Sequence, residues 1–325
     1  MTLLLKILFA LLPRKQADLL LSILAIPAAQ ILLAYRTYGS ASFPATTSRL
    51  RKIGVFPIRN HYYEPLFDDA QLKSPLFEKR ALPGLDLNAT GQLSFLKTLV
   101  YSSELIGLKI DEPGGDANSF YINNGSFESG DAEYLYQLIR VAKPSKIIEI
   151  GSGNSTKIAN LALQKNRTET NRLAQHVCIE PYEMPWLEGY GDIQVIRNRV
   201  EECNFNWAQE LQSGDILFVD SSHVIRPQGD VLTEYLDIFP RLNSGVYIHI
   251  HDIFTPKDYP RSWVVDDIRF WNEQYLLEAL LSNTDRYEII GAINYLKNNH
   301  YEELKAVCPF LTRQREPGSF YLRVR

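Results

Sequence analysis

Residues able to bind cations or exchange protons recur in the second half of the chain, each directly after a short apolar run. Carboxylates and imidazoles bind cations and accept protons, and glycines let a backbone approach a ligand closely. The apolar runs resemble strands, and in a parallel sheet ligands bind outside the carboxyl ends of the strands. We therefore predict one crevice that gathers Gly151, Gly153, Glu180, Asp220, His223, His251 and Asp252.

The stretch 146–156 predicts a buried strand, a tight turn and the start of a helix. Its apolar residues 147–150 are typical of a strand covered on both faces. Gly151 and Gly153 permit the turn, and the polar residues Asn154 and Ser155 can cap the helix. A carboxylate at Glu149 suits a cationic ligand better than a pyrophosphate. S-adenosylmethionine, with its ammonium and sulfonium groups, is such a ligand.

Composition places the chain among ordinary globular proteins. It has 325 residues, 45% of them hydrophobic, and a formal net charge of -4. Because no basic surplus exists, nucleic acid is not expected as a partner. The three cysteines, Cys178, Cys203 and Cys308, show no zinc spacing and no disulfide framework, which favours a reducing cytoplasm. The sequence does not indicate an oligomeric state.

The N-terminus is strongly apolar. Residues 1–12 are apolar apart from Thr2 and Lys6, and residues 19–35 carry no charge. The second run is borderline in length for a membrane span. We favour a helical hairpin packed on the protein; a peripheral membrane contact through residues 1–36 and a true span stay open. A cleaved signal peptide fits poorly, because Pro13, Arg14 and Lys15 divide the apolar runs.

Three regions are expected along the chain. Residues 1–40 form an apolar helical segment, residues 41–128 a loop-rich and helical region, and residues 129–325 the ligand-binding domain. Within the second region, residues 41–90 are rich in Pro, Gly and aromatics and predict irregular loop.

From residue 146 onward, strand-like and helix-like segments alternate. Such alternation predicts an α/β fold: a doubly wound, mostly parallel sheet with helices on both faces. The expected strands are 147–150, 176–179, 193–196, 216–219, 245–250, 287–290 and 319–324, and the main helices between them are 156–165, 231–239 and 270–281.

Over about residues 130–300 the chain resembles the class I S-adenosylmethionine-dependent methyltransferases, a Rossmann-like fold. The run 149–153, Glu-Ile-Gly-Ser-Gly, matches the acid-x-Gly-x-Gly motif of that family. The resemblance implies that Glu180 accepts the ribose hydroxyls and that Glu201 lines the adenine pocket. It further implies cofactor contacts from Glu149, Gly151, Ser152, Gly153, Asn154, Ser155 and Asp220.

A dinucleotide dehydrogenase is the nearest alternative. Its fingerprint needs a third glycine, where this chain has Thr156, and does not ask for Glu149. Two further alternatives stay open. One is a metal-dependent hydrolase or oxygenase that uses the Asp220, His223, His251 and Asp252 cluster. The other is a membrane-tethered protein that binds S-adenosylmethionine without catalysis.

The second half resembles a narrower group, the macrocin O-methyltransferases and cephalosporin hydroxylase-like proteins. Their Asp-x-x-His pattern falls on Asp220 and His223, and their acidic pair falls on His251-Asp252. The resemblance implies O-methylation of a small-molecule or sugar hydroxyl. It also implies a divalent metal, Mg²⁺ or Mn²⁺, on Asp220, Asp252 and, more weakly, His251. His223 and Asp220 are the expected catalytic residues, with His223 as the base.

Overall fold

The computed structural model describes residues 12–113 and 119–325. The chain divides into two compact units, Met1–Lys73 and Ser74–Arg325, which we call the N-terminal unit and the sheet unit. Each is described by itself. The three regions expected from the sequence, with boundaries at residues 40 and 128, stay a prediction.

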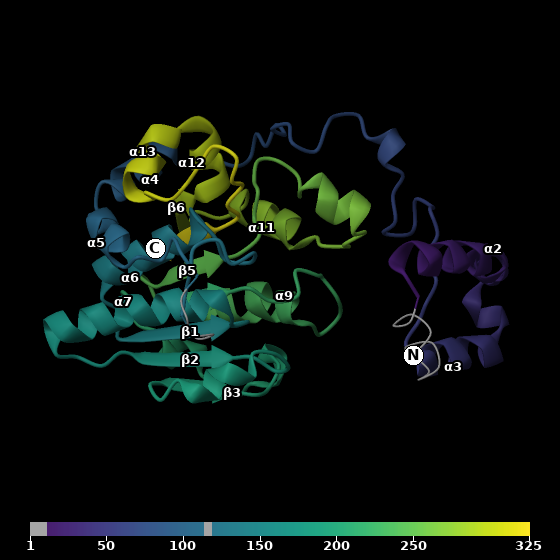
Figure 1. Ribbon diagram of the computed structural model, residues 1–325, viewed down its shortest axis with the longest axis horizontal. Coiled ribbons are helices and arrows are strands. Elements are labelled where there is room, and N and C mark those ends of the chain that lie inside the picture. The colour runs from purple at the N-terminus through teal and green to yellow at the C-terminus, as the bar shows by residue number, and fades with distance from the viewer. Residues whose placement is uncertain (1–11, 114–118) are drawn as a thin grey trace. The chain divides into compact units, whose positions relative to one another are not determined.

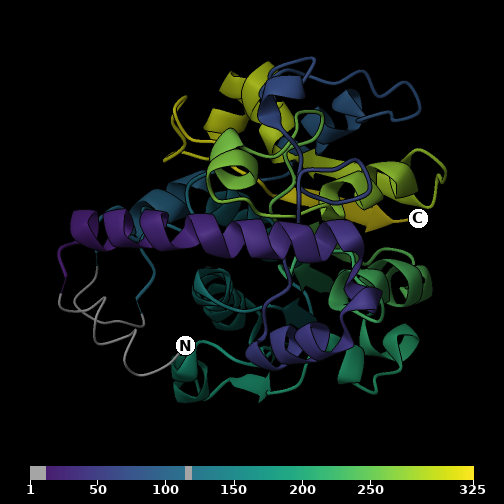
Figure 2. The ribbon, with the colours of Figure 1, turned by 90° about the vertical axis from the view of Figure 1, so that its right-hand side faces the viewer.

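The N-terminal unit is built around one long helix, α2 (Arg14–Tyr38), which Figure 2 shows from the side over its whole length. This confirms helix over residues 14–38, while the first arm of the expected hairpin lies outside the described residues. The expectation of loop over residues 41–90 was wrong for α3 (Pro44–Ile53). Pro44 fits the first turn of this helix, and Gly54 ends it in the left-handed conformation. Short 3-10 turns, η1 (Ser40–Ser42) and η2 (Asp69–Gln71), complete the unit.

The sheet unit contains a seven-stranded sheet with strand order β3-β2-β1-β4-β5-β7-β6 (Figure 1). Strands β1 to β5 run parallel, and β7 runs antiparallel to its neighbours β5 and β6. The strands are β1 (Lys146–Ile150), β2 (Gln175–Ile179), β3 (Ile193–Ile196), β4 (Ile216–Val219), β5 (Tyr247–Ile250), β6 (Tyr287–Ala292) and β7 (Phe320–Val324).

Helices cover both faces of this sheet. One apolar core packs Ile147, Phe218 and Tyr321 of the sheet against α4 (Ala89–Leu96), α5 (Ser102–Gly107), α6 (Asp131–Ala142), α7 (Asn154–Thr170), α12 (Ile293–Asn299) and α13 (Tyr301–Val307). The other core packs Ile148, Val219 and Ile250 against α8 (Trp207–Glu210), the helical run α9 (Asp230–Thr233), η5 (Glu234–Ile238) and α10 (Phe239–Arg241), and α11 (Glu273–Leu281).

The predicted fold class is confirmed, and the strand ends agree with the predictions to within about two residues. The agreement follows from burial, because the central strands are covered on both faces and are therefore continuous apolar runs. The short helices α12 and α13 were not predicted. Since β1 and β4 are adjacent and parallel, Gly151 and Asp220 emerge side by side at the same edge of the sheet.

Candidate functional site

A pocket of about 390 Å³ opens at the carboxyl edge of the central strands, where the crevice was predicted. This is a usual size for a small-ligand site. Four of the residues predicted to bind a cofactor line it: Gly151, Glu180, Glu201 and Asp220. Ile150, Ile179 and Val200 add apolar surface, and Tyr182, Arg199, Ser221, Ser222, Arg226 and Asp230 are among its other lining residues.

The glycine turn brings the ends of two strands unusually close. Gly151 has φ +79°, and a Cβ atom there would lie 1.9 Å from the backbone oxygen of Asp220. Both the backbone conformation and this contact therefore require glycine. Gly153 differs, because its φ of -179° is ordinary extended backbone and a Cβ atom would meet only Met184, at 3.7 Å.

Glu180 ends β2 with its carboxylate held at the pocket by backbone N–H groups. Tyr182 and Glu183 donate to its Oε1 at 3.0 and 2.9 Å, and Ser152 donates to Oε2 at 3.3 Å. Carboxylate oxygens can each accept a further bond from a ligand hydroxyl. Glu201 lies in the short helix η4 (Val200–Glu202), with one oxygen 3.5 Å from Nη1 of Arg199.

Glu149 does not line this pocket. It is fully buried on the sheet face that carries Ile147 and packs against α7, where Thr156 donates a hydrogen bond to its Oε2. Its Oε1 lies 3.3 Å from Nε2 of His176. The structure thus corrects the expectation that this carboxylate faces a cationic ligand group, because its neighbours are protein groups behind the glycine turn.

The remaining residues of the turn build the start of α7 and also lie outside the pocket lining. The Asn154 side chain donates to Asn124 and Ser126 at 3.1 and 2.8 Å, which ties the turn to the loop before α6. Ser155 is buried in the first turn of α7. The Oγ atom of Ser152 is buried and has no hydrogen-bond partner among the described residues.

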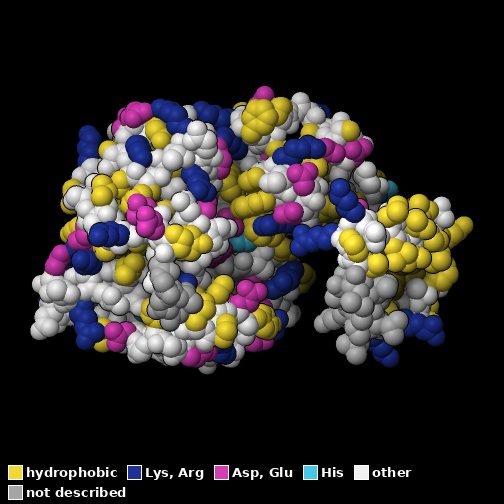
Figure 3. Space-filling model, viewed as in Figure 1, with side chains coloured by type: hydrophobic (Ala, Val, Ile, Leu, Met, Phe, Trp, Pro, Cys, Tyr) yellow, Lys and Arg dark blue, Asp and Glu magenta, His cyan; other side chains and the backbone are white. Residues whose placement is uncertain are grey.

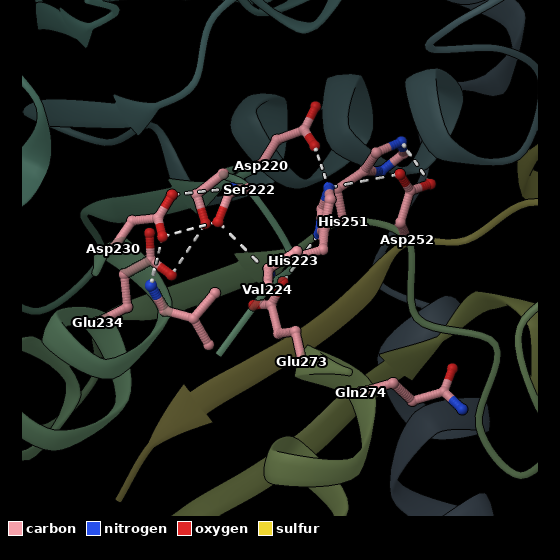
Figure 4. Close-up of polar contacts among 12 residues, drawn as sticks. Asp220, Ser222, His223, Val224, Asp230, Glu234, His251, Asp252, Glu273 and Gln274 are labelled. Carbon is pink, nitrogen blue, oxygen red and sulfur yellow. Dashed lines mark hydrogen bonds and ion pairs between the residues drawn. The ribbon is translucent and has the colours of Figure 1, made fainter. Parts of the chain in front are cut away.

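Beside the pocket, Asp220, His223 and Asp252 converge; we call these three residues the rim cluster (Figure 4). Nε2 of His223 lies 3.2 Å from Oδ1 of Asp220 and 3.6 Å from Oδ2 of Asp252. Two carboxylates and an imidazole nitrogen aimed at one point form a donor set typical of a divalent metal site. The residues present fit such an ion.

The imidazole of His223 is held from behind by groups that the sequence did not reveal. Its Nδ1 lies 2.8 Å from Oε2 of Glu273, which is fully buried and also accepts a hydrogen bond from Tyr235 at 3.1 Å. The ring of Trp271 packs on the imidazole, with 4.3 Å between ring centroids. A carboxylate behind a histidine is the usual support of a metal-binding imidazole. Glu273 lies about 50 residues along the chain, so no local motif announces it.

Two members of the rim cluster have a left-handed backbone. His223 and Asp252 both have φ +58°, which is uncommon for residues with a Cβ atom. The backbone oxygen of His223 accepts hydrogen bonds from the N–H groups of Asn272 and Glu273, at 2.9 and 3.2 Å. Such conformations gather at functional sites, where surrounding contacts hold them in place.

His223, the expected catalytic base, lies among carboxylates that act on its pKa. Burial alone lowers the pKa of His223, but hydrogen bonds to Asp220 and Glu273 outweigh it and raise the pKa well above the usual value. Without a metal, these carboxylates therefore favour the protonated ring. With a metal, the Nε2 lone pair is used for coordination. Burial likewise lowers the pKa of His251, and the charges of Asp252 and Asp220 outweigh it and raise that pKa, so the direction of the pKa shift is the same for both imidazoles.

His251 does not converge with the rim cluster, contrary to its predicted part in a metal site. Its Nε2 lies 3.4 Å from Oδ1 of Asp252. Its Nδ1 is buried and has no hydrogen-bond partner in the described part of the chain. The same is true of Oγ of Ser129, and both residues line a second hollow of about 160 Å³ that also includes Asp252.

The second hollow has both polar and apolar lining residues. Its carboxylate residues are Glu128, Asp131, Asp252 and Glu316, and Trp263 and Phe254 add aromatic surface. Asp252 belongs to this hollow and Asp220 to the first pocket, and both flank Nε2 of His223. The rim cluster therefore lies where two binding spaces meet.

Comparison with known proteins gives a family match and a relative of similar sequence. Residues 148–253 match the model of a family described as a methyltransferase domain. An uncharacterized protein of Archaeoglobus fulgidus is 27% identical over 177 residues, which cover 51% of this chain and 78% of that protein.

Solved structures give a weaker likeness. The plantazolicin methyltransferase BpumL, in complex with a triazolic desmethylPZN analog and SAH, has a TM-score of 0.36 at 11% identity, over 73% of this chain and 98% of its own. An O-methyltransferase from Bacillus cereus in complex with SAH has a TM-score of 0.35 at 12% identity, over 71% and 91%. TM-scores this low do not constrain the substrate.

Proposed function

We propose that this S-adenosylmethionine-dependent methyltransferase transfers the methyl group to a hydroxyl oxygen of a small, polar acceptor such as a sugar. The observation that carries the proposal is the rim cluster, which lies between the first pocket and the second hollow. A neutral hydroxyl is a poor nucleophile, and it needs a group that stabilises or removes its proton.

In this proposal the first pocket, at the ends of β1, β2 and β4, holds S-adenosylmethionine. The Glu180 carboxylate, fixed at the end of β2 by backbone N–H groups, accepts the ribose hydroxyls. Val200 and Ile150 offer apolar surface to the adenine ring, with Glu201 at its edge. Asp220, at the end of β4, provides negative charge for the methionine end of the cofactor.

The rim cluster would hold a divalent metal through Asp220, Asp252 and Nε2 of His223. A nitrogen donor among oxygen donors favours Mn²⁺ over Mg²⁺. When bound, the ion would lower the pKa of an acceptor hydroxyl and orient its oxygen. Glu273 accepts the Nδ1 proton of His223, which leaves Nε2 free to coordinate.

His251 takes the place proposed earlier for His223 as the proton acceptor. His251 lines the hollow in which an acceptor would bind. Its buried Nδ1 has no hydrogen-bond partner among the described residues, and its Nε2 lies beside Asp252. An imidazole nitrogen aimed at the acceptor can take the hydroxyl proton as the oxygen attacks the methyl group. Ser129 and the carboxylates of the hollow supply acceptors for the other hydroxyls of a polyol.

The test uses S-adenosylmethionine carrying a carbon-13 methyl group, the full-length protein, and matched hydroxyl, amine and thiol acceptors. We expect transfer to hydroxyl acceptors, identified by the carbon-13 shift of the product methyl, and loss of that transfer when the metal is chelated. Transfer only to nitrogen or sulfur, or transfer that is indifferent to chelation, would contradict the proposal. Substrate hydrolysis by the metal-loaded protein without the cofactor would favour the hydrolase alternative.

A further inference from the structure

Most of the apolar surface of α2 is not covered by the described residues of the N-terminal unit. Leu19, Ile23, Leu24, Ile26 and Ile31 are between 58% and 70% exposed. The exposed residues are not confined to one stripe: at 100° per residue Leu19 and Leu21 point to nearly opposite sides, and both are exposed. In Figure 3, yellow apolar side chains cover much of the visible surface of this helix.

Among the described residues, the side-chain contacts of α2 with the rest of the unit gather at the C-terminal end of the helix, although Ala17 near its start is also buried. Tyr35 is buried, contacts the rings of Phe43 and Phe56, and shares a hydrogen bond with Thr47. Arg36 pairs with Glu64 and lies over the Phe56 ring. The unit is thus folded around one end of α2, whereas most of residues 19–33 stay exposed.

Charge is distributed unevenly between the two units. Residues 1–73 contain nine Lys and Arg against four Asp and Glu, a net charge of +5. Residues 74–325 contain 25 Lys and Arg against 34 Asp and Glu, a net charge of -9. Exposed basic residues follow the apolar helix closely, on α3, at Arg49, Arg51 and Lys52. Basic residues beside an apolar helix are attracted to anionic lipid headgroups.

We propose that α2 crosses a bilayer that contains anionic phospholipid, with α3 and the sheet unit following it on the anionic, cytoplasmic side. A helix that is apolar on all sides suits surrounding hydrocarbon, whereas a helix lying on a surface needs a polar face. The uncharged residues 19–35 approach the shortest length that spans, and Arg36 and Lys15 can extend to the headgroups. The basic residues that follow the helix, Arg49, Arg51 and Lys52, favour the cytoplasmic side for α3.

The full-length protein should float with vesicles of phosphatidylcholine and phosphatidylglycerol and resist extraction by alkaline carbonate. Replacing Leu24→Lys together with Ile26→Lys should lower partition into the vesicles about 100-fold or more, because each charge is costly at the centre of a span. The matched control is Leu173→Lys with Leu236→Lys, two similarly exposed residues of the sheet unit, which should leave flotation unchanged.

A second variant tests the lipid charge. Changing Arg49, Arg51 and Lys52 to Gln should weaken binding to the anionic vesicles by about fivefold for each residue and leave binding to pure phosphatidylcholine unchanged. S-adenosylhomocysteine binding by all variants reports that the sheet unit is folded, independently of the proposed acceptor chemistry.

Three results would overturn the proposal. The first is a wild-type protein that stays monomeric and does not float. The second is a wild-type protein that does not bind vesicles but forms a dimer, detected by light scattering, which dissociates when α2 carries the two lysines. The third is a mature chain, measured by mass spectrometry of the cellular protein, that begins after α2.

Discussion

Two clusters, each with a histidine and at least one acidic side chain, lie on or beside the same sheet, one buried and one next to the hollows. Glu149, His176 and Cys178, which we call the buried cluster, converge as the rim cluster does. The nearest distances are alike: 3.3 and 3.6 Å in the buried cluster, against 3.2 and 3.6 Å in the rim cluster. The buried cluster is at most 3% exposed and lies under α7, whereas the rim cluster lies between two hollows.

The comparison shows that metal-binding side chains at suitable distances are not enough for a reaction site, which also needs access for a ligand. The buried cluster is held by Thr156 of α7, and no pocket at the strand ends reaches Glu149. The rim cluster has left-handed backbone at two positions and a buried carboxylate behind its imidazole. We therefore expect changes in the buried cluster to alter stability and changes in the rim cluster to alter catalysis.

The largest effect should come from Asp252→Asn in the rim cluster. Loss of this carboxylate removes a metal donor, and a metal of this kind contributes several kcal/mol to catalysis, so kcat should fall about 1000-fold. Metal content by mass spectrometry and kcat should fall together, while cofactor affinity is retained. Asp237→Asn, an exposed carboxylate on η5, is the matched control and should change neither. If D252N keeps both its metal and its kcat, the rim cluster has no more part in catalysis than the buried cluster.

His251→Asn should have the next largest effect. Removal of a general base costs about 100-fold in rate or more, and the loss should be in kcat because the residue does not line the cofactor pocket. Metal content should stay as in the wild type. His300→Asn serves as the control imidazole. If H251N instead loses its metal and H223N keeps it, the original assignment of His251 as the ligand is correct.

The sequence predicted the strands, the position of the crevice and four of the residues that line it. It could do so because central strands are continuous apolar runs and their ends are interrupted by acids and glycines. It did not predict the partner of His223, since Glu273 approaches from a distant helix. Nor could the sequence show which face of the sheet carries the Glu149 side chain. The motif places a carboxylate before the turn, but only the pairing of β1 with β2 shows that it meets His176 and Cys178.

Glu149→Gln tests the other half of the comparison. The change weakens the hydrogen bond from Thr156 and leaves His176 without its acidic neighbour, so the free energy of unfolding should fall by about 1–3 kcal/mol. Affinity for S-adenosylhomocysteine, measured by calorimetry, should stay nearly unchanged. Glu180→Gln should show the opposite pattern, because its carboxylate lines the pocket. Lower affinity without lower stability in E149Q would restore Glu149 as a direct cofactor contact.

The smallest effect concerns the metal-free protein as the pH is changed. The pKa of His223 is raised in the folded state, where hydrogen bonds to Asp220 and Glu273 outweigh burial. Folding therefore favours the protonated ring. The resulting stability is complete below the unfolded pKa of about 6.5 and is lost as the pH rises through the folded pKa.

Urea unfolding of metal-free protein from pH 6 upward should show stability falling by at most about 1.4 kcal/mol per pH unit for this single proton. His223→Gln should remove that part of the slope, and Glu273→Gln should reduce it, because one of the two stabilising carboxylates becomes neutral. Excess Mn²⁺ should reverse the slope, since the ion binds the deprotonated ring. An unchanged slope with Mn²⁺ would mean that the imidazole does not coordinate, and the rim cluster would then resemble the buried one.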